Sequence, residues 1–318
     1  MDKRKIMKKE SSRVSVKRDP DDVSLDNHNS PNNFCSVCEV SFMDINENYE
    51  DIVRFFIQHN ILKNVIQCEQ CMNIIHLNQR DLVFRCNWVD KQTQKKCYFF
   101  KSAKKNTILE HSTIRIKPFF NFVAVLLFLK PPRNKIYREH LKLSNATFSI
   151  WSKLCRDILV KWNEGNFKKI GGPCQTIEVD ISNICGGSSL ILGGICRETK
   201  DFFLHPIEKK YNSSSVTKII EANVEEDSII ITKELEIYDC LKQLETYTHF
   251  SVKKFVDETT GAHINHMQRM WRDVKINIPH HSFKNEHMLQ PYIAEYKFKR
   301  TYSDLERMHF FFKAAGGF

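Results

Sequence analysis

The hydrophobic and polar positions change their period along the N-terminal part of the chain. Between residues 44 and 66 the apolar residues recur at intervals of three and four, which predicts a short amphipathic helix that breaks near His59. Residues 66–116 instead contain short strand-like runs of apolar and aromatic residues, which predicts a small β-rich unit. A helical segment is therefore expected to precede this unit.

Helical spacing returns over residues 117–165. A proline pair and a Ser144-Asn145 turn divide this segment into three helices, and either residue of the turn is a suitable N-cap for the third. Three helices with a short turn before the last are typical of a helix-turn-helix-like DNA-binding region. An ordinary helical bundle with a basic face has the same pattern and remains an alternative.

The pattern changes to strands after the Gly-Gly-Pro sequence at 171–173. Runs of strand-forming residues over 176–182, 189–196 and 201–207 predict a three-strand meander. The later elements alternate: helix 213–223, strand 228–232, helix 235–244, strand 248–252, and helices 263–276 and 286–302. This order predicts an α/β domain with a mixed sheet.

These elements divide the chain into six segments. The expected segments are a disordered basic tail (1–33), a helical segment with a C-x-x-C (34–65), a zinc ribbon (66–116), the helix-turn-helix-like region (117–170), the mixed-sheet domain (171–302) and a C-terminal tail (303–318).

Composition excludes several classes of protein. The 318 residues are 42% hydrophobic and contain 10 Gly and 9 Pro, which is typical of a globular protein and excludes collagen-like and low-complexity chains. The longest apolar run, 119–129, is shorter than the roughly 20 residues that a spanning helix needs. The first twenty residues are charged and lack the apolar core of a secretory leader. We expect an intracellular protein with no membrane partner.

The basic residues are concentrated in one block. Residues 91–170 carry 18 basic and 4 acidic side chains, a net charge of +14, whereas the whole chain carries +10. Such a block favours a polyanionic partner, most simply DNA, although a solvated surface is the alternative. The candidate DNA contacts are Lys95, Lys96, Lys101, Lys104, Lys105 and Arg115 near the β-rich unit, and Lys153, Arg156 and Lys161 on the third helix.

The chain has 11 cysteines, and in a chain that stays inside the cell they favour metal binding over disulfides. Four of them could supply a tetrahedral zinc site, since a hairpin would bring the two pairs together: Cys68, Cys71, Cys86 and Cys97. The second pair has a ten-residue spacing, so buried free thiols remain an alternative. Cys35 and Cys38 form a further C-x-x-C, which His59 or His76 could complete.

Asp180 lies in the middle of the first predicted strand, between Val179 and Ile181. A carboxylate among apolar neighbours is costly unless a partner neutralises it, and a metal ion is one such partner. An exposed position on an edge strand is the alternative. The sequence therefore marks Asp180 as a candidate catalytic residue.

Several blocks of the C-terminal half resemble the Merlin superfamily of DNA transposases and their bacterial ISXO-type relatives. These blocks are IEVD (177–180), LGGICRETK (192–200), KFVDETTGAHINHMQRMW (254–271) and YIAEYKFKRTY (292–302). The resemblance extends upstream, because the family commonly has a zinc ribbon and then a helical DNA-binding region. It implies an α+β multidomain fold whose C-terminal domain is RNase H-like.

The resemblance also implies a triad of acids that binds two Mg²⁺ or Mn²⁺ ions for DNA cleavage and strand transfer. Asp180 matches the first acid, but Lys233 and Gln268 occupy the positions of the second and third. Glu234 replaces Lys233 only if the register slips by one residue. His263 and Asn265 belong to the same blocks and are expected to brace the active-site helix.

Three interpretations follow. The first is a transposase-derived DNA-binding protein with weak or lost strand transfer, and the second is an active transposase or nuclease that uses Asp180 with Glu234. The third is an interaction protein whose zinc unit and α/β domain bind other proteins, which the basic block disfavours. A structural zinc ion, a nuclear location in a eukaryotic host and a homodimer that joins two DNA ends are further expectations.

Overall fold

The computed structural model describes residues 42–110, 115–183, 190–207, 210–253, 263–284 and 286–318. Contacts divide the chain into two units, Met1–Asn33 and Phe34–Phe318, and all of the described residues lie in the second. The predicted basic tail and the Cys35–Cys38 motif lie outside the described residues. None of the helices in the described ranges is long and apolar enough to cross a membrane.

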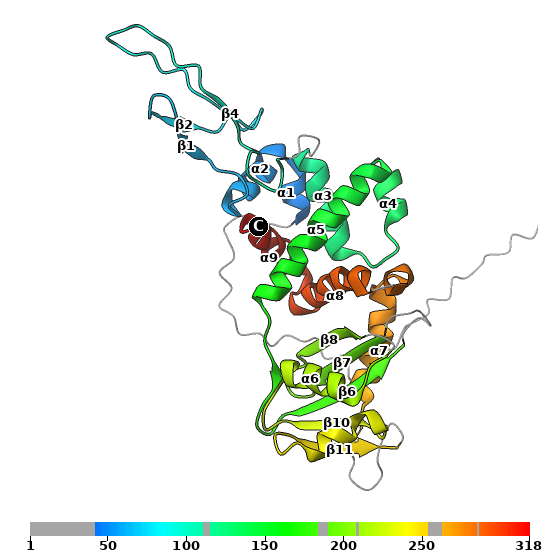
Figure 1. Cartoon of the computed structure of the whole chain (residues 1–318). Helices are drawn as coiled ribbons and strands as arrows, with labels where there is room; N and C mark the ends of the chain where they lie inside the picture. The colour runs from blue at the N-terminus through cyan, green and yellow to red at the C-terminus, as the bar shows by residue number, and fades with distance from the viewer. Residues whose placement is uncertain (1–41, 111–114, 184–189, 208–209, 254–262, 285) are drawn as a thin grey trace, which may run out of the picture. The chain divides into compact units, whose positions relative to one another are not determined.

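A five-stranded mixed sheet is the centre of the C-terminal half (Figure 1). Its strands, in spatial order, are β11 (Thr248–Val252), β10 (Ile229–Lys233), β6 (Thr176–Ser182), β7 (Leu190–Cys196) and β8 (Phe202–Ile207). β6, β7 and β8 form an antiparallel meander, and β10 runs parallel to both β6 and β11. The mixed sheet and the meander were both expected from the sequence.

Strand alternation gives this sheet two apolar faces with separate helical covers. On one face Ile177 and Val179 join a core with α6 (Ser213–Asn223) and the 3₁₀ helix η1 (Glu236–Gln243). On the other face Ile191 and Ile195 pack with α7 (Asn265–Asn277) and the start of α8 (Glu286–Thr301). A short 3₁₀ helix, η2 (His280–Lys284), connects α7 to α8, and β5 (Ile170–Gly171) pairs with β9 (Val224–Glu225).

The remaining helices share one apolar core. They are α1 (Phe42–Glu47), α2 (Tyr49–Gln58), α3 (Ile116–Phe128), α4 (Asn134–Glu139), α5 (Asn145–Gly165) and α9 (Asp304–Gly316). Ser144 is the N-cap of α5, because its side chain accepts a hydrogen bond from the backbone N–H of Thr147. Trp151 is 2% exposed and packs edge-on against Phe119, so it belongs to the core as the sequence suggested.

The C-terminal segment differs from the sequence-based expectation. Residues 303–318 were expected to be a tail, but they contain the helix α9, which Ser303 and Glu306 begin with a reciprocal capping box. Phe311 and Phe312 are fully buried, and Phe312 contacts the ring of Phe55 on α2. α8 contributes side chains both to this core and to the sheet core, so the expected boundary at 302 does not separate two independent cores.

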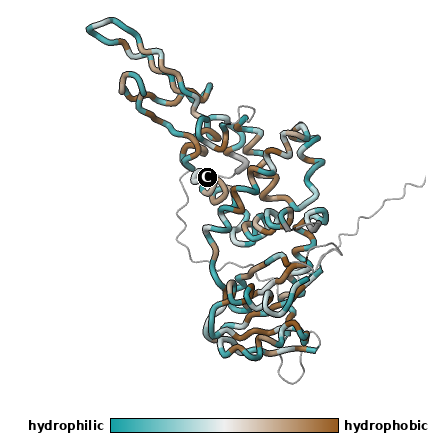
Figure 2. Tube along the Cα trace, in the orientation of Figure 1, coloured by the Kyte–Doolittle hydropathy of each residue, from teal (hydrophilic) through white to brown (hydrophobic). Residues whose placement is uncertain are grey.

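The small β-rich unit consists of two antiparallel hairpins. β1 (Val65–Gln67) pairs with β2 (Ile74–His76), and β3 (Val83–Arg85) pairs with β4 (Phe100–Ser102). The second hairpin continues beyond its regular strands, since Val89 and Lys96 form an isolated antiparallel bridge. Figure 2 shows a hydrophilic tip between more hydrophobic arms in this long hairpin.

Candidate functional site

Two carboxylates on β6 point to the same face of the sheet. Glu178 and Asp180 are two residues apart, so strand alternation directs both toward α7. Their exposed fractions are 0% and 1%. A buried carboxylate is costly without partners that neutralise it. The surroundings of each acid therefore determine what it can do chemically.

One oxygen of Asp180, Oδ2, receives three donors. The Lys233 ammonium lies 3.0 Å from this oxygen, the Gln268 amide donates at 3.1 Å and the Trp271 indole N–H donates at 3.0 Å. We call these four residues the Asp180 cluster. The positive charge of the ammonium balances the carboxylate, so the cluster is close to neutral as it stands.

The local fold explains why these donors meet. β10 lies beside β6 in parallel register, with Thr232 opposite Val179, and this places Lys233 next to the acid. The indole of Trp271 reaches the acid across Gly193 of β7, where an added Cβ would lie 2.7 Å from the ring. Glycine at this position therefore makes room for the tryptophan.

The structure brings together the positions that the transposase resemblance singled out. Lys233 and Gln268, which stand where two further acids were expected, both contact Asp180. Glu234 is exposed and has the opposite strand parity to Lys233. Asp273, five residues after Gln268 on α7, is hydrogen-bonded to side chains of α8 instead.

The Asp180 cluster does not fit a pair of divalent cations. Within the described ranges, the groups with metal-ligand spacing are the four cysteines and the trio Glu178, His263 and His266, and neither group includes Asp180. Mg²⁺ prefers several oxygen ligands in octahedral geometry. An ammonium 3.0 Å from the carboxylate would repel an incoming cation at this point.

Glu178 has a different set of partners, which we call the Glu178 cluster. Arg197 donates from Nε to its Oε1 at 2.8 Å, and His266 Nδ1 lies 2.9 Å from the same oxygen. The backbone N–H of Met267, in the first turn of α7, donates to Oε2 at 3.0 Å. Negative charge is favoured at a helix N-terminus, so this contact binds the start of α7 to β6.

His266 and His263 both lie in the Glu178 cluster and have different roles there. The Lys200 ammonium lies 3.2 Å from Nε2 of His266, which leaves Nδ1 as the protonated nitrogen that donates to Glu178. His263 Nδ1 accepts from Arg197 at 3.0 Å. Burial, followed by the neighbouring guanidinium, lowers the pKa of His263 and favours its neutral form.

The Glu178 cluster is thus a brace that aligns α7 with the sheet. The sequence suggested a bracing role for His263 and Asn265 but overlooked Glu178, Arg197 and His266. One signal was available, since Glu178 is a charged residue in the same apolar strand as Asp180. Because the guanidinium of Arg197 already contacts both the carboxylate and His263, its positive charge opposes a metal ion at Glu178, His263 and His266.

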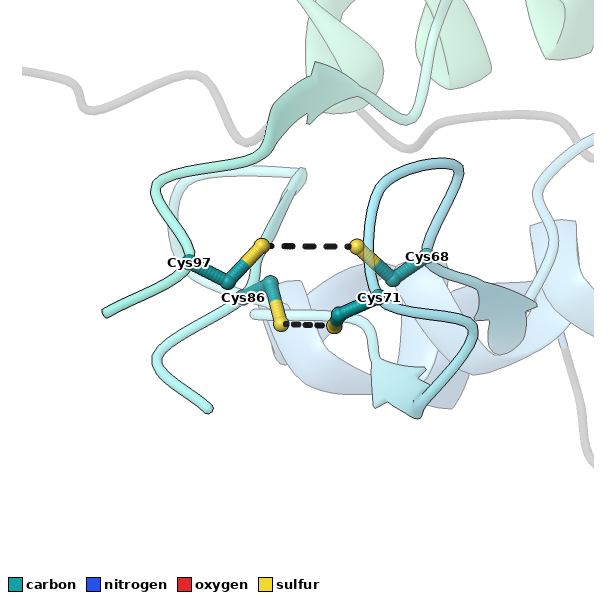
Figure 3. A group of neighbouring side chains, drawn as sticks. All are labelled: Cys68, Cys71, Cys86 and Cys97. Atoms are coloured by element: carbon teal, nitrogen blue, oxygen red, sulfur yellow. Dashed lines mark hydrogen bonds between the residues drawn. The ribbon is translucent and has the colours of Figure 1, made fainter. Parts of the chain in front are cut away.

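The four predicted cysteines form a cluster, which we call the cysteine cluster (Figure 3). Cys68 and Cys71 lie in the β1–β2 turn, whereas Cys86 follows β3 and Cys97 precedes β4. The four sulfur atoms lie within 4.8 Å of one another, with Sγ–Sγ distances of 3.7 Å for Cys68–Cys97 and 3.4 Å for Cys71–Cys86.

This geometry fits zinc. Four sulfurs at 2.3 Å from a tetrahedral ion would be about 3.8 Å apart. Hydrogen bonds from Asn73 lower the pKa of Cys71 to about 6, which favours the thiolate that a metal needs, whereas burial and the neighbouring thiols raise the pKa of Cys86 and of Cys97. The backbone N–H of Gln70 also points at Cys68 Sγ, 3.4 Å away. The cysteine cluster could therefore bind a zinc ion.

Two of the predicted DNA contacts, Lys104 and Arg115, meet at a hollow of about 720 Å³. The sequence did not associate them with Arg80, Lys117 and His140, which also line it. Burial lowers the pKa of Lys104, as expected for a cation in a partly enclosed site. The hollow lies at the N-terminus of α3, which also favours anions. We call it the basic hollow.

The other predicted DNA contacts differ in their surroundings. Lys95, Lys96 and Lys105 are exposed, whereas Lys101 is ion-paired with Glu69 at 2.7 Å.

The candidate contacts on α5 are also engaged to different extents. Lys153 pairs with Asp157 at 2.7 Å yet keeps 77% of its side chain exposed, and Lys161 lies over the ring of Phe318. Arg156 is 17% exposed and lies 3.6 Å from Glu295 of α8. Burial opposes the ionisation of Glu295, but the cations around it lower its pKa to about 2. Arg156 thus belongs to a buried ion network between α5 and α8.

One comparison with known proteins bears on the mixed-sheet half. Residues 189–301 match the ISXO2-like transposase domain, a match that supports descent from DDE-type transposases. The match includes Lys233 and Gln268 and starts after Asp180. No curated protein matches the chain.

Proposed function

We propose that this protein is a transposase-derived DNA-binding protein of Merlin or ISXO type whose RNase H-like domain has lost metal-dependent strand transfer. The observation that carries the proposal is the Asp180 cluster. Lys233 and Gln268 stand at the two positions where a transposase would have acids, and both contact the remaining acid. The mixed sheet, with its meander and two further parallel strands, supports the RNase H-like assignment.

The loss of strand transfer follows from charge. Two-metal catalysis needs carboxylates that bind both ions and balance their charge. In the Asp180 cluster a single carboxylate is already neutralised by Lys233 at 3.0 Å. The Gln268 amide uses its N–H on the same oxygen and adds no negative charge. The residues at this site therefore cannot balance two Mg²⁺ or Mn²⁺ ions.

DNA binding is supported by two features outside the sheet. The basic hollow combines side chains of the β-rich unit and of the α3–α4 region around an opening of about 720 Å³. Cations grouped in this way neutralise phosphates. The cysteine cluster would bind a structural zinc ion and fix the hairpins that carry further lysines.

The interpretation of residues 117–170 as a helix-turn-helix-like DNA-binding region remains part of the proposal. α3, α4 and α5 follow each other there, but α5 buries Arg156 against α8. We therefore assign phosphate contact to Lys153 and Lys161, which are exposed, and no base contact to Arg156. A DNA-associated intracellular location, nuclear in a eukaryotic host, and a homodimer that joins two DNA ends complete the proposal.

An active transposase built on Asp180 and Glu234 is the competing function. It requires both carboxylates to reach one metal ion, but Glu234 is exposed, and its neighbour Lys233 is the residue that contacts Asp180. The geometry therefore favours the DNA-binding remnant.

The test compares DNA binding with DNA cleavage in the same preparation. Purified protein is incubated with supercoiled plasmid and Mg²⁺ or Mn²⁺ while its binding to the same DNA is measured by gel shift, with Asp180→Ala as the matched variant. We expect a salt-dependent shift and no nicking by either protein. Nicking that disappears in Asp180→Ala would show an active site and overturn the proposal. Absence of both nicking and shift would overturn the DNA-binding assignment.

A further inference from the structure

The long hairpin of the β-rich unit has an unusual outer face. Its register is continuous, because the pair Arg85–Phe100 near its base and the bridge Val89–Lys96 near its tip have the same alignment. The backbone hydrogen bond from Cys97 to the carbonyl of Trp88, at 2.8 Å, fits this register. Alternation along both strands therefore extends from the regular sheet to the tip.

Alternation divides the residues of the two strands between two faces, and both cysteines of the hairpin lie on one of them. One face carries Phe84, Cys86, Trp88, Cys97, Phe99 and Lys101 and faces the cysteine cluster. The other carries Arg85, Asn87, Val89, Lys96, Tyr98 and Phe100, all of them exposed, and we call it the hairpin face. The cross-strand pairs on the hairpin face, such as Arg85–Phe100 and Val89–Lys96, are non-hydrogen-bonded pairs. In pairs of this kind the side chains lie closer together than in hydrogen-bonded pairs.

Aromatic rings and cations are interleaved on the hairpin face. Tyr98 is 79% exposed and Phe100 is 60% exposed. Lys96 Nζ lies 5.7 Å from the centre of the Tyr98 ring, and the Arg85 guanidinium lies 5.8 Å from that of Phe100. Arg85 also forms an exposed ion pair with Asp81 at 3.3 Å, which a phosphate would have to replace. Large exposed apolar groups next to one another mark an interaction site. The opposite face has its own packing, since Phe84 is 2% exposed, so the outer rings are not part of the core.

The charge at this site identifies the chemistry of the partner. Lys91 and Lys95 add two exposed cations at the tip, next to Lys96. The acid between the strands, Asp90, uses its carboxylate on the backbone N–H groups of Gln92 and Thr93, at 2.7 and 3.0 Å. The face therefore offers rings for stacking and cations for phosphates. That combination is typical of surfaces that bind single-stranded nucleic acid.

We propose that the hairpin face binds an unpaired stretch of DNA by stacking bases on Tyr98 and Phe100 while Arg85 and Lys96 neutralise the adjoining phosphates. In duplex DNA the bases are stacked on one another 3.4 Å apart and present no open ring face, so the two aromatic rings act only on unpaired bases. This inference rests on the proposed DNA-binding function and names the form of DNA that this part of the chain binds.

Binding to a labelled single strand and to its duplex, measured by fluorescence anisotropy with the full chain, tests the inference. The double variant Tyr98→Leu with Phe100→Leu keeps apolar side chains but removes both rings. We expect its affinity for the single strand to fall about tenfold or more, with little change for the duplex. The exchange Tyr98→Phe with Phe100→Tyr keeps both rings and should bind as the parent does. Lys96→Ala should weaken both forms of DNA alike.

Two readouts keep folding defects separate from lost stacking. The zinc content of each variant reports whether the hairpin is still assembled. In the unmodified protein, a single strand that contains 5-iododeoxyuridine should photo-crosslink to the peptide containing Tyr98 or Phe100. Crosslinks found only elsewhere would overturn the inference. It would also be overturned if the variant Tyr98→Leu with Phe100→Leu lost the same affinity for the duplex as for the single strand.

Two further outcomes separate this inference from the proposed function. Duplex binding that persists while the ring variants bind the single strand normally would overturn the inference alone. Failure of the parent protein to bind either form of DNA would overturn the proposed function. Tighter binding to a single-stranded RNA of the same sequence would overturn the assignment to DNA.

Discussion

The cysteine cluster and the Asp180 cluster are two sites that the sequence predicts to bind metal, and the structure shows that they differ in the ligands and the charge they offer to an ion. The cysteine cluster has four thiol ligands within 4.8 Å of one another. The Asp180 cluster has one carboxylate, and a lysine ammonium 3.0 Å away supplies the positive charge that a metal would bring. In both, residues distant in sequence converge as a metal site requires.

The difference shows that position and chemistry can be separated in a protein site. Under the proposed function Lys233 and Gln268 occupy the positions of two metal ligands, and the packing of β10 and α7 around β6 brings both side chains to Asp180. If strand transfer has been lost as proposed, the Lys233 ammonium serves to neutralise the buried Asp180 carboxylate and avoids an unpaired charge in the core.

The largest expected effect concerns the cysteine cluster. Cys86→Ser removes one of the four thiols that could bind zinc, and metal binding at structural zinc sites contributes about 10–16 kcal/mol to folding. We expect zinc, measured by mass spectrometry of the metal, to fall from about one ion per chain to none, with loss of the hairpin structure. Cys174→Ser is the control, because Cys174 is an exposed cysteine outside the cluster. Retention of zinc by Cys86→Ser would contradict the four-thiol assignment.

The second effect tests whether the Glu178 cluster stabilises the packing of α7 against β6. Glu178→Gln leaves the Arg197 guanidinium, which is 21% exposed, without its charged partner. We expect the free energy of unfolding in urea to fall by about 3 kcal/mol. Glu221→Gln, an exposed site on α6, should change it by less than about 0.5 kcal/mol. Equal stabilities of the two variants would refute the bracing role.

The third effect would turn the Asp180 cluster into a metal site. In the double variant Lys233→Asp with Gln268→Glu, three carboxylates would meet where one is now neutralised. Without metal their mutual repulsion should lower the melting temperature. Mn²⁺ at a hundredfold excess over its dissociation constant should restore about 2.7 kcal/mol of stability.

Calorimetry with and without Mn²⁺ measures this restoration. The unmodified chain is the control and should show no Mn²⁺-dependent change at this site. If Mn²⁺ did not raise the melting temperature of the double variant, the backbone around Asp180 would not hold three carboxylates in a metal-binding arrangement.

The smallest effect is a dependence of stability on pH at His263. Its pKa in the folded protein is lowered, so the unfolded chain takes up the proton first as the pH falls below 6.5. The contribution of neutral His263 is complete above that pH and is lost as the pH falls toward the folded pKa. Urea midpoints measured between pH 7.5 and 5 should fall less steeply for His263→Asn. Parallel curves for the two proteins would exclude this assignment.

Much of the local structure could be read from the sequence. The strand over 176–182, the cap at Ser144 and the pairing of the cysteine knuckles depend on periodicity, capping preference and ligand type, and these are properties of neighbouring residues. The tail predicted at 303–318 contains the helix α9, for which the capping-box spacing of Ser303 and Glu306 is a local signal.

The surroundings of the buried acids could be anticipated only in part. The transposase resemblance gave the positions of Lys233 and Gln268, but the ammonium contact with Asp180 spans 53 residues and the amide contact spans 88. The partners of Glu178 were missed altogether. Arg197 lies between β7 and β8, and His266 is the second residue of α7, so no local pattern connects them to β6.

The sequence by itself determined the order of helices and strands, the ligand type of the cysteine cluster and the concentration of positive charge in residues 91–170. The tertiary structure decided which charges meet: Lys233 with Asp180, Arg197 with Glu178, and Arg156 with a buried glutamate instead of solvent. The reason is physical. Periodicity and capping act over a few residues, whereas the cost of burying a charge is met by whichever opposite charge the packing of distant elements brings within about 3 Å.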